Sequence, residues 1–511
     1  MFSLHKKTAL TDCVKILAVW VSADDNARTV MRALSFMSYV KGEAPGQSSL
    51  FPVSLDELIP ADHLVRVIEA YVARLDMAEL GFARAVTKTT GRPPYDPADL
   101  LKLYLYGYLH RIRSSRRLEA ECQRNVEVMW LLGRLAPDHK TIADFRRMNH
   151  KGFTALCRAF VQFCRQAGLI AGELVAIDGS KFQAVAARRQ LITSARLAKQ
   201  EKALEARIAA YLQQMDDADK VEASSEIDRT AMQEALRLLQ ARRDDVQSAR
   251  TLMETMGLRQ LVQTEPDAKD MRTARGPRIA YNVQTAVDAK HALILHHDVT
   301  TEGTDNRQLL PVAEAAKAVL DQETLTVVAD AGYSNLTQFQ ACDDAGITAH
   351  VPPNRAHNTQ GNRTLFDRSR FSYDAERDEY VCPNNQRLTL KQLNAHDQNR
   401  IYAASPGDCD ECPLKPQCTQ ATQRFVSRHT HEAAGERMQA RLVAAPDMMA
   451  RRRALVEHPY AGLKYWIMGH ARLLMRGLEG AGTEMALAVN AYNLKRVINI
   501  VGVPALMVMM A

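Results

Sequence analysis

Three short stretches, far apart in the chain, each carry one carboxylate in a setting that favours metal chemistry. Asp178 ends the apolar run 174–177, and Asp330 ends the apolar run 325–329. Runs rich in β-branched residues are typical of buried strands, and a buried acid needs a cation or a metal ion beside it. Glu457 is the third acid, on a predicted helix. Two Asp and one Glu form an oxygen-only ligand set, which suits Mg²⁺ or Mn²⁺ rather than zinc.

The motifs around these acids resemble those of the DDE transposases of bacterial insertion sequences, in the branch with an InsH-like helical N-terminal domain. The first acid lies in Ala-Ile-Asp-Gly-Ser (176–180) and the second in Ala-Asp-Ala-Gly-Tyr (329–333), which contains a DAGY motif. The third lies in Arg-x3-Glu-x6-Lys (453–464), although Ala450 stands where that group usually has Tyr. The resemblance covers roughly residues 50–502. It implies a transposase that cuts the ends of an insertion sequence and joins them to target DNA.

The resemblance also implies roles for the site residues. Asp178, Asp330 and Glu457 would hold two Mg²⁺ (or Mn²⁺) ions, the arrangement that serves in-line phosphodiester transfer. On an ideal helix, Arg453, Glu457 and Lys464 lie within about 40° of one another. This spacing predicts that Glu457 faces the metal ions while the two basic side chains contact DNA phosphates. Pro459 lies in the same stretch and predicts a bend or a helix start there.

The order of predicted elements resembles a ribonuclease-H-like α/β fold, a mixed sheet flanked by helices. The strands are predicted at residues 173–181, 279–287, 292–300, 324–330 and 347–351, with a helix at 308–320. This topology makes the first strand and the second-acid strand neighbours, which would bring Asp178 and Asp330 together. The catalytic domain is predicted over residues 171–354 and 430–511.

Residues 50–170 are predicted to form a helical DNA-binding domain. Asp96-Pro97 is typical of a helix start, with an N-cap followed by proline at the first helical position. Arg116 and Arg117 follow Arg111 and Arg113 within seven residues, and Arg-rich helix edges suit contacts to DNA phosphates. A solvated helix face is the alternative for each of these arginines.

Two further segments are predicted to be insertions in the catalytic domain. Residues 194–256 have the charged, heptad-spaced pattern of an antiparallel helical hairpin. Residues 355–429 are predicted to be a small insertion rich in β-strands and cysteine. Its four cysteines have the spacing of a structural zinc site, with an iron–sulfur cluster or four free thiols as alternatives: Cys382, Cys409, Cys412 and Cys418.

Composition and charge restrict the class of protein. A hydrophobic content of 46% and a charged content of 24% are ordinary for a globular protein. The net charge of +7 is compatible with a polyanionic partner, here double-stranded DNA in the form of terminal inverted repeats and target. No apolar run reaches the roughly 20 residues of a membrane span, so we expect a cytoplasmic protein with no membrane partner. Residues 1–49 are predicted to be a disordered extension, with Met37 a plausible start of translation.

Two other functions stay open at this stage. A ribonuclease-H-like nuclease would use the same acids without strand transfer. A DNA-binding repressor derived from a transposase would keep the fold without the chemistry, although the three intact acids speak against it. Acting on two DNA ends at once implies a homodimer in the DNA complex.

Overall fold

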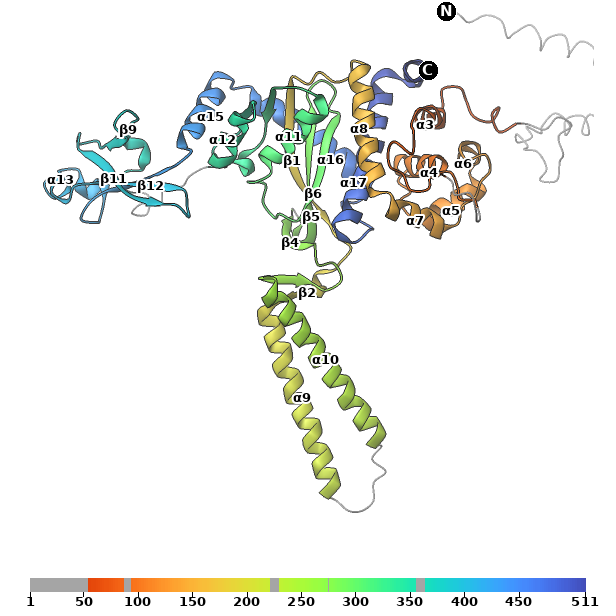
Figure 1. Ribbon diagram of the computed structural model, residues 1–511, viewed down its shortest axis with the longest axis horizontal. Helices are drawn as coiled ribbons and strands as arrows, with labels where there is room; N and C mark the ends of the chain where they lie inside the picture. The colour runs from red at the N-terminus through yellow and green to blue at the C-terminus, as the bar shows by residue number, and fades with distance from the viewer. Residues whose placement is uncertain (1–53, 87–92, 221–228, 274, 355–363) are drawn as a thin grey trace, which may run out of the picture. The chain divides into compact units, whose positions relative to one another are not determined.

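The computed structural model describes residues 54–86, 93–220, 229–273, 275–354 and 364–511, and the predicted extension 1–49 lies outside this range (Figure 1). Residues 55–511 form one compact unit. The helices of its first part are α3 (Leu64–Ala73), α4 (Pro97–Leu109), α5 (Ser115–Arg124), α6 (Val126–Leu131), α7 (His139–Met148) and α8 (His150–Gln166). Asp96 caps α4 by accepting a hydrogen bond from the amide of Ala98, and Pro97 is the first helical residue, as the sequence predicts.

A six-stranded mixed sheet follows the helical region. Its strands are β1 (Leu174–Gln183), β4 (Lys269–Thr273), β5 (Gly276–Asp288), β6 (Ile294–Thr300), β7 (Leu325–Val328) and β8 (Ile347–His350). The strand order is β4-β5-β1-β7-β8, with β6 also paired to β5. β5 runs antiparallel to β1, β4 and β6, whereas β1, β7 and β8 are mutually parallel. The first strand and the second-acid strand are therefore neighbours, which confirms that prediction.

The two faces of β1 bury different partners because successive side chains of a strand point to opposite faces. Val175 and Ile177 belong to the main hydrophobic core, and α11 (Leu309–Leu320) packs on β1, β5, β6 and β7. Leu174 and Ala176 lie instead in a smaller cluster with Val456 of α16 (Met448–Ala461). The sheet thus lies between α11 and α16, and Asp178, two residues after Ala176, is on the α16 side.

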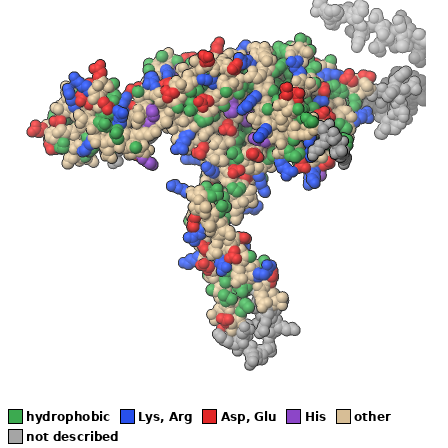
Figure 2. Space-filling view, in the orientation of Figure 1, with side chains coloured by type: hydrophobic (Ala, Val, Ile, Leu, Met, Phe, Trp, Pro, Cys, Tyr) green, Lys and Arg blue, Asp and Glu red, His purple; other side chains and the backbone are tan. Residues whose placement is uncertain are grey.

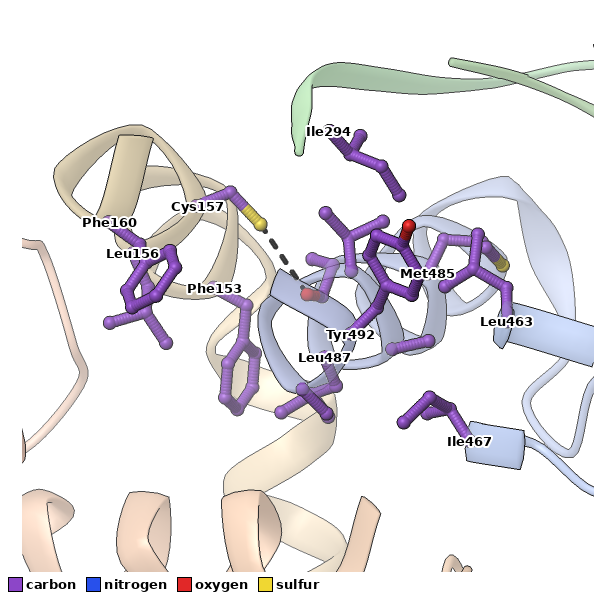
Figure 3. Packing of buried hydrophobic residues seen from close by; sticks show 14 of the residues in the cluster. Phe153, Leu156, Cys157, Phe160, Ile294, Leu463, Ile467, Met485, Leu487 and Tyr492 are labelled. Atoms are coloured by element: carbon purple, nitrogen blue, oxygen red, sulfur yellow. Dashed lines mark hydrogen bonds between the residues drawn. The ribbon is translucent and has the colours of Figure 1, made fainter. Parts of the chain in front are cut away.

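The late helix α17 (Gly477–Val501) joins the sheet to the helical region. It packs against β6, α4, α7 and α8, and Figure 3 shows Phe153 of α8 beside Leu487 of α17. Asn493 of α17 closes the free edge of β6 by bonding both backbone groups of Ile294. The same hydrophobic core therefore runs from α3 to the last helix, α18 (Val503–Met510).

Two segments leave the sheet at the positions of the predicted insertions. The first contains β2 (Leu191–Thr193), α9 (Ser194–Lys220), α10 (Arg229–Thr255) and β3 (Gln260–Val262), with α9 packed against α10. The second is a five-stranded antiparallel sheet of order β13-β12-β11-β10-β9. Its strands are β9 (Ser372–Asp374), β10 (Glu379–Val381), β11 (Arg387–Asn394), β12 (Asn399–Ala404) and β13 (Phe425–His429). Helices α12 (Leu336–Asp344), α13 (Pro406–Asp410), α14 (Lys415–Cys418) and α15 (Glu432–Ala444) complete the described α-helices.

The C-terminal helices α17 and α18 are rich in apolar residues. In the described part of the chain, no single helix is long and apolar enough to cross a membrane. The pair α17 and α18 passes by length and composition, with a bend of 111° between them. Residues along most of α17 are buried inside the protein.

Candidate active site

The parallel pairing of β1 with β7 places Asp178 and Asp330 at the same edge of the sheet. The pairing ends with Ala176 opposite Val328, and each Asp follows two residues later. One nitrogen of Arg452, on α16, lies 2.6 Å from Asp178 Oδ1 and 3.4 Å from Asp330 Oδ2. Two acids from distant parts of the sequence thus share one cation.

Arg452 only partly compensates the negative charge that Asp178 and its acidic neighbours carry at this edge of the sheet. Burial raises the pKa of Asp178 to about 6, the Arg452 guanidinium opposes this shift, and the Asp330 and Asp305 carboxylates add to it. The Asp178 side chain is 19% exposed and that of Asp330 46%. A divalent cation beside these oxygens would relieve the same repulsion that Arg452 relieves in part.

The third predicted ligand, Glu457, has a different setting. Its side chain is exposed on α16, and the described contacts include none between its carboxylate and Asp178 or Asp330. Among the residues that the structure describes, no group of three His, Cys, Asp or Glu side chains is arranged to hold a metal ion. The structure therefore brings together two of the three predicted acids, with a basic side chain between them.

Asp330 is held by the turn that follows it. Its carboxylate accepts a hydrogen bond of 2.8 Å from the amide of Gly332 and caps a single 3-10 turn, Ala331–Tyr333. A Cβ at Gly332 would lie only 2.9 Å from Asp330 Oδ1, so glycine permits this close approach. Tyr333 is buried and its hydroxyl donates to Gln284 of β5. The DAGY residues thus connect the turn that carries the second acid to β5, which lies on the other side of β1 from β7.

Asp305 belongs to the segment between β6 and α11, and its carboxylate lies close to Gly179, next to Asp178. Its Oδ1 accepts hydrogen bonds from Asn282 (2.6 Å), Gln284 (2.7 Å) and Lys181 (3.2 Å). A Cβ at Gly179 would lie 2.5 Å from both Asp305 Oδ1 and Gln284 Nε2. The glycine after the first acid therefore makes room for this buried polar chain. Sequence reasoning missed Asp305, because an acid among Thr and Asn in a loop looks like an ordinary turn.

Sequence reasoning also missed Arg452, although the chain carries a signal for it. Arg452, Val456 and Tyr460 are spaced four residues apart, which places them on one side of a helix. Val456 and Tyr460 are both buried, so this side faces the sheet. The side chain of Arg452 is 14% exposed, whereas that of Arg453, which the motif singles out, is exposed.

The end of α16 departs from an ideal helix. The helix continues through Pro459 to Ala461, and a π-helical turn, Gly462–Ile467, follows directly. This wider turn changes the angular spacing, so the predicted common face of Arg453, Glu457 and Lys464 does not hold. Lys464 instead donates to Ser180 on β1, two residues after Asp178, and burial lowers its pKa.

The predicted DNA-contacting arginines of the helical region differ in burial. Arg116 and Arg117 lie exposed in the first turn of α5, whereas Arg113 is buried and pairs with Glu484 of α17. Lys and Arg side chains are interspersed with Asp and Glu over the face in view in Figure 2. The exposed pair is therefore available for a partner, and Arg113 serves the contact with α17.

Two family models match parts of this chain. A family model described as transposase domain (DUF772) matches residues 53–148, and one described as transposase DDE domain matches residues 260–494. Together, these matches support a DDE transposase. The second match includes Asp330 and Glu457 and begins after Asp178.

No curated protein matches the chain. Among solved structures, a cryo-EM structure of a piggyBac transposase synaptic complex with hairpin DNA is similar at 10% identity and a TM-score of 0.29. The similarity covers 89% of this chain and 77% of that one, but the TM-score is too low to bear on the fold.

Proposed function

We propose that this transposase cuts the ends of an insertion sequence and joins them to target DNA, on a ribonuclease-H-like fold. The observation that carries the proposal is the pairing of β1 with β7, which gives Asp178 and Asp330 one shared cation, Arg452. The strand order and directions of the mixed sheet support the fold assignment. The InsH-like branch and a cytoplasmic location belong to the same proposal.

The residues at this edge of the sheet suit divalent metal ions. Asp178 and Asp330 would hold Mg²⁺ or Mn²⁺, with Glu457 as the third ligand, because carboxylate oxygens are the ligands these ions prefer. When bound, two such ions activate the attacking oxygen and stabilise the leaving 3′-oxygen of a phosphodiester. The turn after Asp330 holds that carboxylate in place, and the Asp305 network packs against Gly179, next to Asp178. Lys464, in the π-helical turn after α16 and bonded to Ser180 of β1, supplies a positive charge for a DNA phosphate close to Asp178.

DNA binding is proposed to combine the helical region with α16. Arg116, Arg117 and Arg453 are exposed and would contact phosphates of the terminal repeats or of the target. Charged contacts of this kind release counterions, so binding should weaken steeply with salt. A homodimer would present two such sites to the two ends of the element.

The test uses the full chain and a supercoiled plasmid that carries the DNA flanking its own reading frame. Asp178→Asn and Asp330→Asn should reduce cleavage to background with Mg²⁺ or Mn²⁺, because each removes a metal ligand but little volume. Glu323→Gln is the matched control, since Glu323 is exposed just before β7, at the opposite end of that strand. Cleavage within about tenfold of wild type in either Asn variant would overturn the assignment of the site.

The products of the same reaction distinguish a transposase from a nuclease that only cuts. A transposase yields DNA ends joined to a second plasmid, whereas a ribonuclease-H-like nuclease yields cut ends alone. Glu457→Gln reports separately on the third ligand. Unchanged activity in that variant would remove Glu457 from the site and leave the two aspartates in it.

A further inference from the structure

The five-stranded β-sheet segment has a small hydrophobic core of its own. Its buried members are Phe371, Tyr380, Leu388, Tyr402, Ala404 and Val426. Segments with so few buried side chains usually need a disulfide or a structural metal for stability. Cys382, Cys409 and Cys418 pack against this core, and all are free thiols.

Four cysteines from separate elements line one small cavity beside this core. Cys382 follows β10, Cys409 lies in α13, Cys412 follows α13 and Cys418 ends α14. The cavity has a volume of about 20 Å³, which is room for one water-sized particle. The four cysteines that the sequence analysis grouped by their spacing therefore lie around the same cavity in the folded chain.

Backbone amide groups of the following turn are directed at the sulfur of Cys382. The backbone amides of Asn384 and Gln386 point at Cys382 Sγ, at 3.3 and 3.4 Å. Cys382 also bonds its own amide to the Gln386 carbonyl, and Asn385 adopts a left-handed conformation with φ of 56°. Amide donors directed at a sulfur stabilise its negative charge, as outer partners of metal ligands do.

Basic side chains line the same cavity. Arg424 and Lys415 both border it, and the buried Arg424 donates to the carbonyl of Cys418 at 2.9 Å. Four thiolates around one divalent ion carry two negative charges in excess. Arg424 would offset part of this excess, whereas Lys415 is paired with Asp410 at 2.6 Å and Asp408 also lines the cavity.

We propose that Cys382, Cys409, Cys412 and Cys418 bind one zinc ion that fixes α13 and α14 to the β-sheet segment. The described side chains are not yet grouped as a finished metal site, so the ion must draw the four sulfurs to about 2.3 Å. Cys409 lies on α13 and Cys418 on α14, two short helices that residues 411–414 join. The site is separate from Asp178 and Asp330 and does not depend on the proposed function.

Metal analysis of the full chain, purified under reducing conditions, tests the proposal. We expect about one zinc per chain, loss of that zinc in Cys412→Ser, and its retention in Cys122→Ala. Cys122 is the matched control because it is a buried free thiol of α5, outside the cavity.

Two measurements on the wild-type chain test the same proposal if Cys412→Ser does not fold. Chelation should make four further thiols reactive, because thiolates bound to zinc are protected. Cobalt added in place of zinc should give the intense thiolate-to-metal absorption of a tetrahedral site. Protein free of metal with all four thiols reactive would overturn the proposal, as would the visible absorption of an iron–sulfur cluster.

Discussion

Arg452 occupies the position between Asp178 and Asp330 that a metal ion would share with them. Without it, two carboxylates face each other at a partly buried edge of the sheet, and each disfavours the charge of the other. The guanidinium therefore acts as a counter-charge for the metal-free protein. It must also give way, at least in part, when a divalent ion binds between the same oxygens.

Arg452→Ala should destabilise the protein in buffer without divalent metal by about 1–3 kcal/mol, a value discounted for the exposure of Asp330. Mn²⁺ should raise the melting temperature of this variant more than that of wild type, because the ion replaces the lost charge. Arg453→Ala, one residue along and exposed, should change stability by less than about 0.5 kcal/mol. Equal melting temperatures for the two variants would contradict a charge-balancing role.

The raised pKa of Asp178 predicts the direction of a pH effect on stability. The folded protein holds this proton up to about pH 6, whereas an unfolded chain releases it near 3.8. The contribution of Asp178 to folding is thus complete below about pH 4 and is lost as pH rises through 6. Urea unfolding without divalent metal should show wild type losing stability relative to Asp178→Asn over this interval. Parallel stability curves for the two proteins would show that the proton is not held more tightly on folding.

The element that delivers Arg452 is α16, and Tyr460 docks it on the sheet. The buried hydroxyl of Tyr460 lies 2.8 Å from the carbonyl of Asp178 and 2.7 Å from that of Val283. Tyr460→Phe should cost about 1–3 kcal/mol in unfolding free energy, because a buried carbonyl then loses its donor. The variant should also lose cleavage activity by displacing Arg452 and Lys464. Tyr465→Phe, at a residue that is 55% exposed, should leave both quantities near wild type.

The sequence predicted the elements whose signals are local. The apolar strands around both aspartates, the hairpin of β5 and β6 and the start of α4 all follow from short patterns of burial and capping. The docking of α16 could not be predicted in this way, since the π-helical turn after Pro459 depends on contacts with a distant strand. β11 was missed because most of its side chains are exposed on both faces, which leaves no alternation to recognise.

The exposed first turn of α5 is the element to which we assign contacts with DNA ends. Changing Arg116 and Arg117 to Glu in the full chain should weaken binding to the flanking DNA and flatten its dependence on salt, because phosphate contacts are lost. The same charge change at Arg158 and Arg165, both exposed on α8, is the control. Equal weakening in both double variants, by electrophoretic mobility shift over a salt series, would assign the effect to net charge alone.

At the scale of the whole molecule, the helical region and the sheet share a single core. Arg113 and Arg146 lie 3.9 and 3.6 Å from the carboxylate of Glu484, which is fully buried in α17. Burial raises the pKa of Glu484, and both arginines oppose that shift. This buried group of charges closes the contact between α17 and the helical region, next to the apolar packing of α4 and α8.

Residues 55–170 should therefore unfold together with the catalytic sheet. Glu484→Gln should leave two buried arginines without their counter-charge and lower the melting temperature of both parts by the same amount. Hydrogen exchange in α4 and in β1 reports on the two parts separately. Loss of protection in α4 alone would mean that the helical region is an independent module.

If the helical region recognises DNA ends as proposed, the shared core also limits how that recognition can diverge. An exchange of residues 55–170 between two transposases of different end specificity would pair each helical region with a foreign α17, and so with a foreign partner for Arg113 and Arg146. Such a chimera should be soluble and active only if α17 is exchanged as well. Recombination between relatives would then have to exchange two separate segments together: residues 55–170, before the sheet, and α17, near the C-terminus.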